Sequence, residues 1–254
     1  MFKKGNALIK REKIYFLSDL HLKLDKKAGT VSAKETLLKF LDSIPDDAKE
    51  IVLLGDIFDF WYEWVHVIPA YHFDIFFRLK SLINKNVKVS YLAGNHDFYL
   101  GDYLRSEIGI NCIENEYVFE SGGKKFFSAH GDGLARSDGG YRFLKMILRS
   151  KICNFLFRTL IPPDLGICIA NFTSKSSRKY RNIDRVKWRE EYFEYASSKL
   201  KEGYDFAILG HLHLPEITET DNGTYLNTGD WIEYFSYGLF DGVNLTLERF
   251  NEKK

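Results

Sequence analysis

Five short clusters of Asp, Asn and His, each ending a predicted strand, constrain this 254-residue chain more than any other sequence feature. In order they read Asp19-Leu20-His21, Gly55-Asp56-Ile57-Phe58-Asp59, Gly94-Asn95-His96-Asp97, His130-Gly131-Asp132 and Gly210-His211-Leu212-His213. In an open α/β sheet, ligands bind beyond the carboxyl ends of the strands, so we expect the clusters to converge on one rim. The glycines at 55, 94, 131 and 210 predict tight turns where a larger side chain would block a close approach.

The segments around the clusters predict a mostly parallel α/β fold. Short apolar runs rich in β-branched and aromatic residues predict strands at 13–18, 50–55, 87–94, 124–129 and 205–210. Apolar residues three and four apart predict helices at 33–41 and 70–83. Alternating strands and helices are typical of βαβ units. Asp221-Asn222-Gly223 predicts a hairpin turn, and residues 134–200 are expected to be helical.

The residue types in the clusters predict a metal site. Residues two apart in extended backbone point the same way, so Asp19 with His21, and His211 with His213, can each present two ligands. Carboxylates and imidazoles without a thiolate suit Mn, Fe or Zn rather than calcium. Seven candidate ligands suit two ions about 3.5–4 Å apart better than one. They are Asp19, His21, Asp56, Asn95, His130, His211 and His213. Asp56 is the candidate bridge, because a carboxylate has two oxygens to share.

Each cluster taken alone has a simpler interpretation. The Asp19–His21 pair could be ordinary surface polarity, Asp97 could cap a helix after a turn, and the paired histidines could be half-buried and bonded to backbone. Five such clusters at successive predicted strand ends favour a shared site instead. His66 and His72 lie in an aromatic helical stretch and are expected to be structural.

Composition narrows the class of protein. A hydrophobic content of 45% argues against wholesale disorder. Three scattered cysteines without a CxxC pair give neither a disulfide framework nor a zinc ribbon. No apolar stretch is as long as the core of a signal peptide or a membrane span, and this predicts a cytoplasmic protein. The net charge of +1 argues against a uniformly basic nucleic-acid binder, but residues 134–189 alone carry +10 and the remainder −9.

The ordered motifs from Asp19 to His213 resemble the calcineurin-like metallophosphoesterase superfamily. The resemblance implies an α/β fold, a four-layer αββα sandwich forming one domain over 1–254, with a helical insertion or lid at 134–200. It implies that Asp19, His21, Asp56 and His213 hold one ion, and Asp56, Asn95, His130 and His211 the other. His96 would face the scissile phosphate, stabilise its charge and assist the leaving oxygen. The nucleophile would be hydroxide from a water activated by both cations.

Further features resemble one branch, the UDP-2,3-diacylglucosamine hydrolases of lipid A biosynthesis. They are Trp61 after the second motif, Phe98 after the third, Ser137-Asp138-Gly-Gly-Tyr141 after the fourth, and the basic cluster from Ser174 to Arg181. The resemblance implies sugar and phosphate contacts at Asp138, Ser174, Lys175, Arg178 and Arg181. It also implies an acyl or sugar pocket lined by Trp61, Phe98 and Tyr141, although Trp61 and Phe98 could equally be core residues. His96 departs from the branch, whose better-known members carry Arg there.

The branch implies a pyrophosphatase that releases UMP and 2,3-diacylglucosamine 1-phosphate, with Mn²⁺ as the expected metal and Fe²⁺ or Zn²⁺ as alternatives. The basic, apolar insertion predicts peripheral contact with the inner membrane, although a helical hairpin packed on the sandwich is the alternative. Neither a nucleic-acid partner nor an obligate protein partner is expected. The competing functions are a soluble phosphodiesterase or phosphatase acting on nucleotides or phosphoproteins, and a scaffold without catalysis. A scaffold should have lost ligands, and none is missing here.

Overall fold

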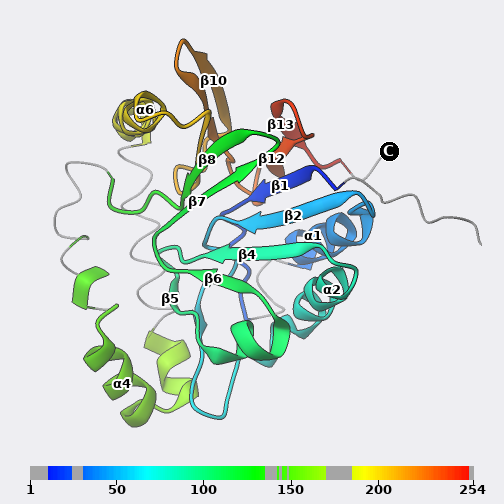
Figure 1. The fold of residues 1–254 in the computed structure, drawn as a ribbon. Coiled ribbons are helices and arrows are strands. Elements are labelled where there is room, and N and C mark those ends of the chain that lie inside the picture. The colour runs from blue at the N-terminus through cyan, green and yellow to red at the C-terminus, as the bar shows by residue number, and fades with distance from the viewer. Residues whose placement is uncertain are drawn as a thin grey trace, which may run out of the picture.

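Two β-sheets packed face to face form the centre of the computed structural model, with helices on their outer faces (Figure 1). The structure describes residues 11–24, 31–134, 142, 145–147, 149–169 and 185–251. The first sheet has the strand order β13-β12-β1-β2-β4-β6, and the second has the order β10-β11-β9-β8-β7. The two sheets and two helical layers confirm the predicted αββα sandwich.

Parallel strands form most of the first sheet. Its members are β1 (Lys13–Leu17), β2 (Ala48–Leu53), β4 (Lys88–Leu92), β6 (Asn111–Ile113), β12 (Ser236–Phe240) and β13 (Leu245–Arg249). The first four run parallel, β12 pairs antiparallel with β1, and β13 pairs antiparallel with β12 at the edge of the sheet. Two helices cover the outer face, α1 (Val31–Ser43) and α2 (Phe73–Asn84), the second preceded by the 3-10 turn η1 (Ala70–His72). These elements confirm the predicted strands and helices of the first half of the chain.

The second sheet combines a parallel centre with two hairpins. Its members are β7 (Glu116–Ser121), β8 (Lys124–Ala129), β9 (Phe206–Leu209), β10 (Glu216–Thr220) and β11 (Gly223–Asn227). Strands β8, β9 and β11 run parallel, while β7–β8 and β10–β11 are antiparallel pairs. The β10–β11 turn falls at the predicted Asp221-Asn222-Gly223. Two short strands, β3 (Trp61–Tyr62) and β5 (Asp97–Tyr99), pair separately, and a π-helix, η2 (Tyr103–Ile108), follows β5.

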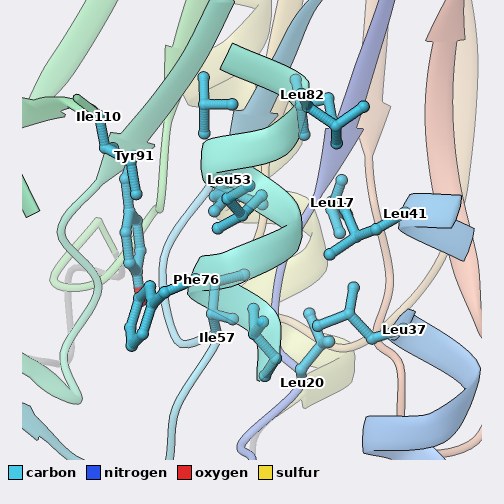
Figure 2. Close-up of a cluster of buried hydrophobic side chains, with 14 of the residues drawn as sticks. Leu17, Leu20, Leu37, Leu41, Leu53, Ile57, Phe76, Leu82, Tyr91 and Ile110 are labelled. Carbon is cyan, nitrogen blue, oxygen red and sulfur yellow. The ribbon is translucent and has the colours of Figure 1, made fainter. Parts of the chain in front are cut away.

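Alternating side chains of β1 bury both faces of the first sheet. Ile14 and Phe16 point into the core between the sheets, and Tyr15 and Leu17 point toward the outer helices. Figure 2 shows the outer cluster, where Leu17 lies among the side chains of both helices. Burial on both faces makes the sheet rigid, so the loops at its strand ends have a fixed foundation.

The outer face of the second sheet is covered by α6 (Arg185–Lys201). Its buried residues Tyr192, Ala196 and Leu200 are spaced four apart and pack in one cluster with residues of β8 and β9. This helix falls in the predicted 134–200 insertion, but its packing makes it a layer of the sandwich. The described remainder of that segment includes α4 (Lys151–Leu160) and helical residues 163–169. Across the residues that the structure describes, no helix is long and apolar enough to cross a membrane.

Candidate metal centre

All five motifs meet at the carboxyl ends of parallel strands from both sheets. Asp19 and His21 follow β1, Asp56 follows β2, Asn95 and His96 follow β4, His130 follows β8, and His211 and His213 follow β9. The arrowheads of β1, β2 and β4 point to one side of the molecule in Figure 1. The predicted convergence on a single rim is therefore confirmed.

Asp19, His21 and His213 form the first group of candidate ligands. Asp19 Oδ1 lies 3.3 Å from His213 Nε2 and 3.7 Å from His21 Nε2. The two Nε2 atoms are 3.3 Å apart, and the rings are nearly parallel with centroids 5.1 Å apart. One ligand atom from each residue lies within 4.8 Å of the others, which is a spacing that a single cation can span.

The second group lies around His130. Its Nε2 is 3.4 Å from Asp56 Oδ2, 3.2 Å from His211 Nδ1 and 3.2 Å from Asn95 Oδ1. Asp56, His130 and His211 again place ligand atoms within 4.8 Å of one another. The two groups thus contain the residues that the family resemblance assigns to two ions.

Asp56 lies between the two groups. Its Oδ2 atom faces His130 Nε2 of the second group at 3.4 Å and His21 Nε2 of the first at 3.7 Å. Its Oδ1 atom accepts the backbone N–H of His96 at 2.8 Å, which fixes the orientation of the carboxylate. This is the position that a bridging ligand requires.

Two buried carboxylate oxygens in the centre accept no hydrogen bond from any described residue, namely Asp19 Oδ1 and Asp56 Oδ2. Both carboxylates are buried, and their other oxygens accept backbone N–H groups of His211 and His96. A buried polar atom without a partner costs about 1–3 kcal/mol, and more when it is charged. Because each of these oxygens points at imidazole nitrogens of its own group, the residues fit a pair of divalent cations.

Backbone strain is concentrated in the same residues. Among the described residues, seven other than glycine have positive φ angles, and five of the seven are candidate ligands. These five are Asp19, His21, Asp56, His211 and His213, with φ between 46° and 68°. The left-handed region costs an L-residue about 1–2 kcal/mol. Strain of this kind persists where a site requires it, so its location supports a functional centre.

Gly55 and Gly94 allow the motif loops to approach one another. Gly55 has a φ of +87°, and a Cβ there would lie 2.7 Å from His130 Nδ1. A Cβ at position 94 would lie 2.3 Å from Asp56 Oδ1. Both positions therefore exclude a side chain, as predicted for glycines at a close approach.

Hydrogen bonds behind the imidazoles fix their orientation. His130 Nδ1 donates to the carbonyl oxygen of Leu54 at 2.6 Å, and His213 Nδ1 donates to Asp230 Oδ2 at 3.1 Å. Such bonds select the tautomer whose other nitrogen is free to bind a metal. Asp230 was not predicted, although its place three residues after the end of β11, at the same rim, was an available signal.

Asp97 connects two motif loops. Its Oδ2 atom accepts the backbone N–H groups of Asp56 and Gly94, both at 2.9 Å, and its Oδ1 atom accepts the Tyr91 hydroxyl at 2.7 Å. The helix-cap interpretation is wrong, because Asp97 begins the strand β5. Burial and the nearby Asp56 raise the pKa of Asp97 to about 6.

The buried carboxylates and imidazoles of the centre shift one another's pKa values. Burial disfavours the charged form of the His130 ring, but the negative charge of Asp56 outweighs the effect of burial and raises the pKa of His130 to about 10. Burial likewise opposes ionisation of Asp56, yet His130 and His96 hold the pKa of this carboxyl well below its usual range. A metal ion must displace the His130 proton to use this nitrogen, so metal affinity falls as the pH falls.

His96 lies beside both groups. Its Nδ1 atom donates to the carbonyl oxygen of Asp59 at 2.7 Å, and its Nε2 atom is 3.9 Å from Asp56 Oδ2. The ring meets His21 edge to face, with centroids 4.6 Å apart. Asp59 itself was not predicted as a site residue, although it belongs to the second motif. Its carboxylate lies 3.7 Å from Nδ1 of both histidines.

Most predicted substrate contacts lie outside the described residues, namely Asp138, Tyr141, Ser174, Lys175, Arg178 and Arg181. Phe98 lies in β5, but its side chain is also outside the description. Trp61 is fully buried and packs on Phe58 and Phe76, with centroids 5.2 and 5.0 Å away. These contacts agree with the interpretation of Trp61 as a core residue and not with a place in the wall of a pocket.

A cavity of about 390 Å³ lies between α4 and the segment after the third motif. Apolar and charged side chains share its wall, including Tyr99, Leu100, Arg105, Phe155 and Arg158. Bonds from the Tyr62 hydroxyl to the Asn154 carbonyl and from Trp64 Nε1 to the Ile161 carbonyl, both at 2.9 Å, hold α4 against the segment after the second motif. The cavity is therefore bounded by α4 on one side and by the loop of the third motif on the other.

His72 is confirmed as a structural residue. It is fully buried, and its ring lies 4.3 Å from that of Phe58. Burial, with a smaller contribution from Lys34, lowers its pKa to about 3. The folded protein therefore holds His72 neutral, whereas the unfolded chain binds a proton below about pH 6.5.

We expect this difference to destabilise the metal-free protein as the pH falls from about 6.5 toward 3, since only the unfolded state gains the proton. Between pH 7 and pH 5 the wild type should lose about 2 kcal/mol more unfolding free energy than His72→Phe, which cannot titrate. Urea denaturation of both proteins at the two pH values measures this. An identical pH dependence would contradict the assignment.

Comparisons with known proteins agree with this centre. Residues 12–215 match the family model for calcineurin-like phosphoesterases. A Porphyromonas gingivalis protein named UDP-2,3-diacylglucosamine hydrolase is 31% identical over 259 residues, covering 95% of this chain and 99% of the relative. A protein of the same name from Neisseria meningitidis serogroup B is 28% identical over 242 residues, covering 93% and 98%. The chain belongs to the calcineurin-like phosphoesterase family, and its fold and Asp/His groups indicate a hydrolase that uses divalent metals.

Proposed function

We propose that the protein hydrolyses the pyrophosphate of UDP-2,3-diacylglucosamine, giving 2,3-diacylglucosamine 1-phosphate and UMP. The observation that carries the proposal is that the Asp56 carboxylate lies between two buried Asp/His groups and faces imidazole nitrogens of both. The named relatives, which align over nearly the full chain, supply the substrate. Mn²⁺ is the proposed metal, with Fe²⁺ and Zn²⁺ as alternatives.

In this mechanism the two groups would hold the cations in the arrangement that the family resemblance implies. One ion would be held by Asp19, His21, Asp56 and His213, and the other by Asp56, Asn95, His130 and His211. When bound, two divalent cations supply hydroxide at neutral pH and neutralise charge on the phosphoryl oxygens. Bonds behind the imidazoles hold their ring nitrogens toward this space, so the centre is organised before substrate arrives.

His96 is the proposed catalytic acid. The Asp59 carbonyl fixes its Nδ1–H, which leaves Nε2 near Asp56 and facing the centre. From there Nε2 can donate to a phosphoryl oxygen and, as imidazolium, protonate the leaving oxygen. A positioned acid of this kind contributes about 10²–10⁴ in rate.

His96→Ala is expected to lower turnover by about a hundredfold or more while both cations still bind. Steady-state kinetics with Mn²⁺ and titration calorimetry measure the two effects. His96→Arg, which restores charge without an acid of suitable pKa, separates charge stabilisation from proton donation. Loss of a metal ion from His96→Ala would make His96 a ligand and contradict this role.

The substrate assignment is tested by turnover of UDP-2,3-diacylglucosamine with Mn²⁺, beside bis(p-nitrophenyl) phosphate and cyclic nucleotides. We expect the lipid sugar nucleotide to have the highest kcat/KM and to yield UMP. Hydrolysis of the generic diester without turnover of the lipid sugar would favour a soluble phosphodiesterase or phosphatase instead.

We also infer that the insertion acts as a lid that contacts the cytoplasmic face of the inner membrane. The exposed side chains of α4 include Ile152 and Phe155, exposed by 73% and 67%, together with Leu156 and Leu160. Grouped exposed apolar side chains are typical of interaction surfaces. The excess basic charge of residues 134–189 attracts anionic headgroups, which brings the centre to a lipid substrate.

The double variant Ile152→Ser/Phe155→Ser should weaken binding to vesicles containing anionic lipid by about tenfold or more, because it removes two apolar side chains from the contact. Its hydrolysis of bis(p-nitrophenyl) phosphate should not change. Phe73→Ser/Phe77→Ser is the matched control, since both phenylalanines are 63% exposed but lie on α2. Equal vesicle binding by the two double variants would refute the α4 contact.

A further inference from the structure

Arg149, just before α4, reaches from the insertion into the body of the protein. Its Nη2 atom donates to the carbonyl oxygens of Ala93 and Gly94 at 3.1 and 3.2 Å. Its Nη1 atom donates to the Glu114 carbonyl at 2.8 Å and to Asn115 Oδ1 at 3.2 Å. One side chain therefore contacts four acceptors that belong to two separate segments.

These acceptors lie at two junctions of the fold. Ala93 and Gly94 follow β4 and directly precede the candidate ligand Asn95. Glu114 and Asn115 connect β6 of the first sheet to β7 of the second. The planar guanidinium, with five N–H donors in a fixed fork, can bond to both at once, which an ammonium group cannot do with the same geometry.

Lys145, one helical turn earlier, makes a parallel connection to the other sheet. Its Nζ atom lies 2.7 Å from Asp132 Oδ2 and donates to the Asp132 carbonyl at 3.3 Å. Asp132 follows the candidate ligand His130 by two residues, and its Oδ2 atom is also 4.0 Å from Arg149 Nη2. The start of the insertion is thus bonded to the loops that carry ligands of the second group from both sheets.

We propose that Arg149 is a positioning residue that couples docking of the insertion to metal binding at the second group. The bonds to Ala93 and Gly94 hold the backbone that presents Asn95, so losing them should lower affinity for one ion more than for the other. Coupling between two binding events is reciprocal, so metal binding should in turn stabilise the docked insertion. The inference rests on the proposed metal site but is independent of the substrate.

The test uses the full-length chain and Mn²⁺ alone. Calorimetry should show that Arg149→Ala binds one of two Mn²⁺ ions about 10–100-fold more weakly, which is the usual effect of removing a residue behind a ligand. Hydrogen exchange across 151–160 should slow when Mn²⁺ is added to the wild type and change little in Arg149→Ala. Arg149→Lys should recover the charge but not the full affinity.

Arg78→Ala is the matched control, because Arg78 pairs with Asp42 on the outer helices. Lys145→Met is the second variant if Arg149→Ala does not fold, and it should also weaken one ion. The inference would be overturned if a folded Arg149→Ala bound both ions with wild-type affinity. It would also be overturned if Mn²⁺ slowed hydrogen exchange across 151–160 in Arg149→Ala as much as it does in Arg78→Ala. If Arg149→Ala had a higher KM but unchanged metal affinity, Arg149 would be a substrate contact, and the inference would again be wrong. If the wild type bound no Mn²⁺, the proposed centre itself would fail.

Discussion

Asp56→Asn is expected to lower turnover at least about a thousandfold, a loss near 4 kcal/mol in transition-state stabilisation. The carboxylate Oδ2 faces imidazoles of both groups, so its replacement by an amide weakens both cation sites together. Calorimetry with Mn²⁺ and steady-state kinetics should show both effects. The change should be far larger than for a residue that contacts one ion only.

The metal-free fold should survive this substitution. The amide oxygen of Asn can still accept the His96 N–H that Asp56 Oδ1 accepts now, and His130, whose pKa the Asp56 carboxylate raises, can become neutral when that charge is removed. Asp42→Asn, at an exposed carboxylate paired with Arg78, is the matched control and should be active. Near-normal turnover in Asp56→Asn would rule out the bridging role.

Regular periodicity made the first half of the fold predictable. The predicted helix at 33–41 became α1 (Val31–Ser43), and the predicted strand at 50–55 became β2 (Ala48–Leu53). The strand ends earlier than predicted because Gly55, with a φ of +87°, turns the chain into the motif loop. The helix predicted at 70–83 divides into η1 and α2, a difference in helix type that apolar spacing alone does not specify.

The convergence of the motifs was also predictable, since parallel strands end at the same edge of a sheet. The hydrogen bonds that support the ligands could not be predicted, because they depend on which strands become neighbours in the sheets. Asp230 reaches His213 only because β11 lies beside β9, and Ser18 meets Thr228 across 210 positions of sequence. Strand β6 has only three residues, which is too short for a periodic signal.

The packing of α6 shows a similar limit. Tyr192, Ala196 and Leu200 are spaced for a helix, and they lie in the segment 134–200 that was predicted to be helical. It does not specify what the apolar stripe covers, so the helix was assigned to the insertion although it covers the second sheet. Burial partners follow from the tertiary arrangement and not from the pattern along one helix.

Gly94→Ala is expected to lower Mn²⁺ affinity and turnover about a hundredfold, the scale of a 1 Å displacement in a catalytic group. The new Cβ would lie 2.3 Å from Asp56 Oδ1 and 2.7 Å from the Asp56 backbone nitrogen, so the bridging carboxylate must move. Because a backbone atom is involved, a rotamer change alone cannot relieve the clash. Calorimetry with Mn²⁺, beside thermal unfolding, measures the effect.

Gly101→Ala provides the matched control. A Cβ there would lie 2.4 Å from Glu63 Oε2 and 2.7 Å from Tyr99 Cε1, a similar clash but with side-chain atoms outside the metal centre. Both variants should lose stability, by about 1–3 kcal/mol for an overpacked site. Only Gly94→Ala should lose metal affinity as well. Equal Mn²⁺ binding by the two would mean that the centre tolerates movement of Asp56, which is incompatible with one carboxylate holding two ions in a fixed geometry.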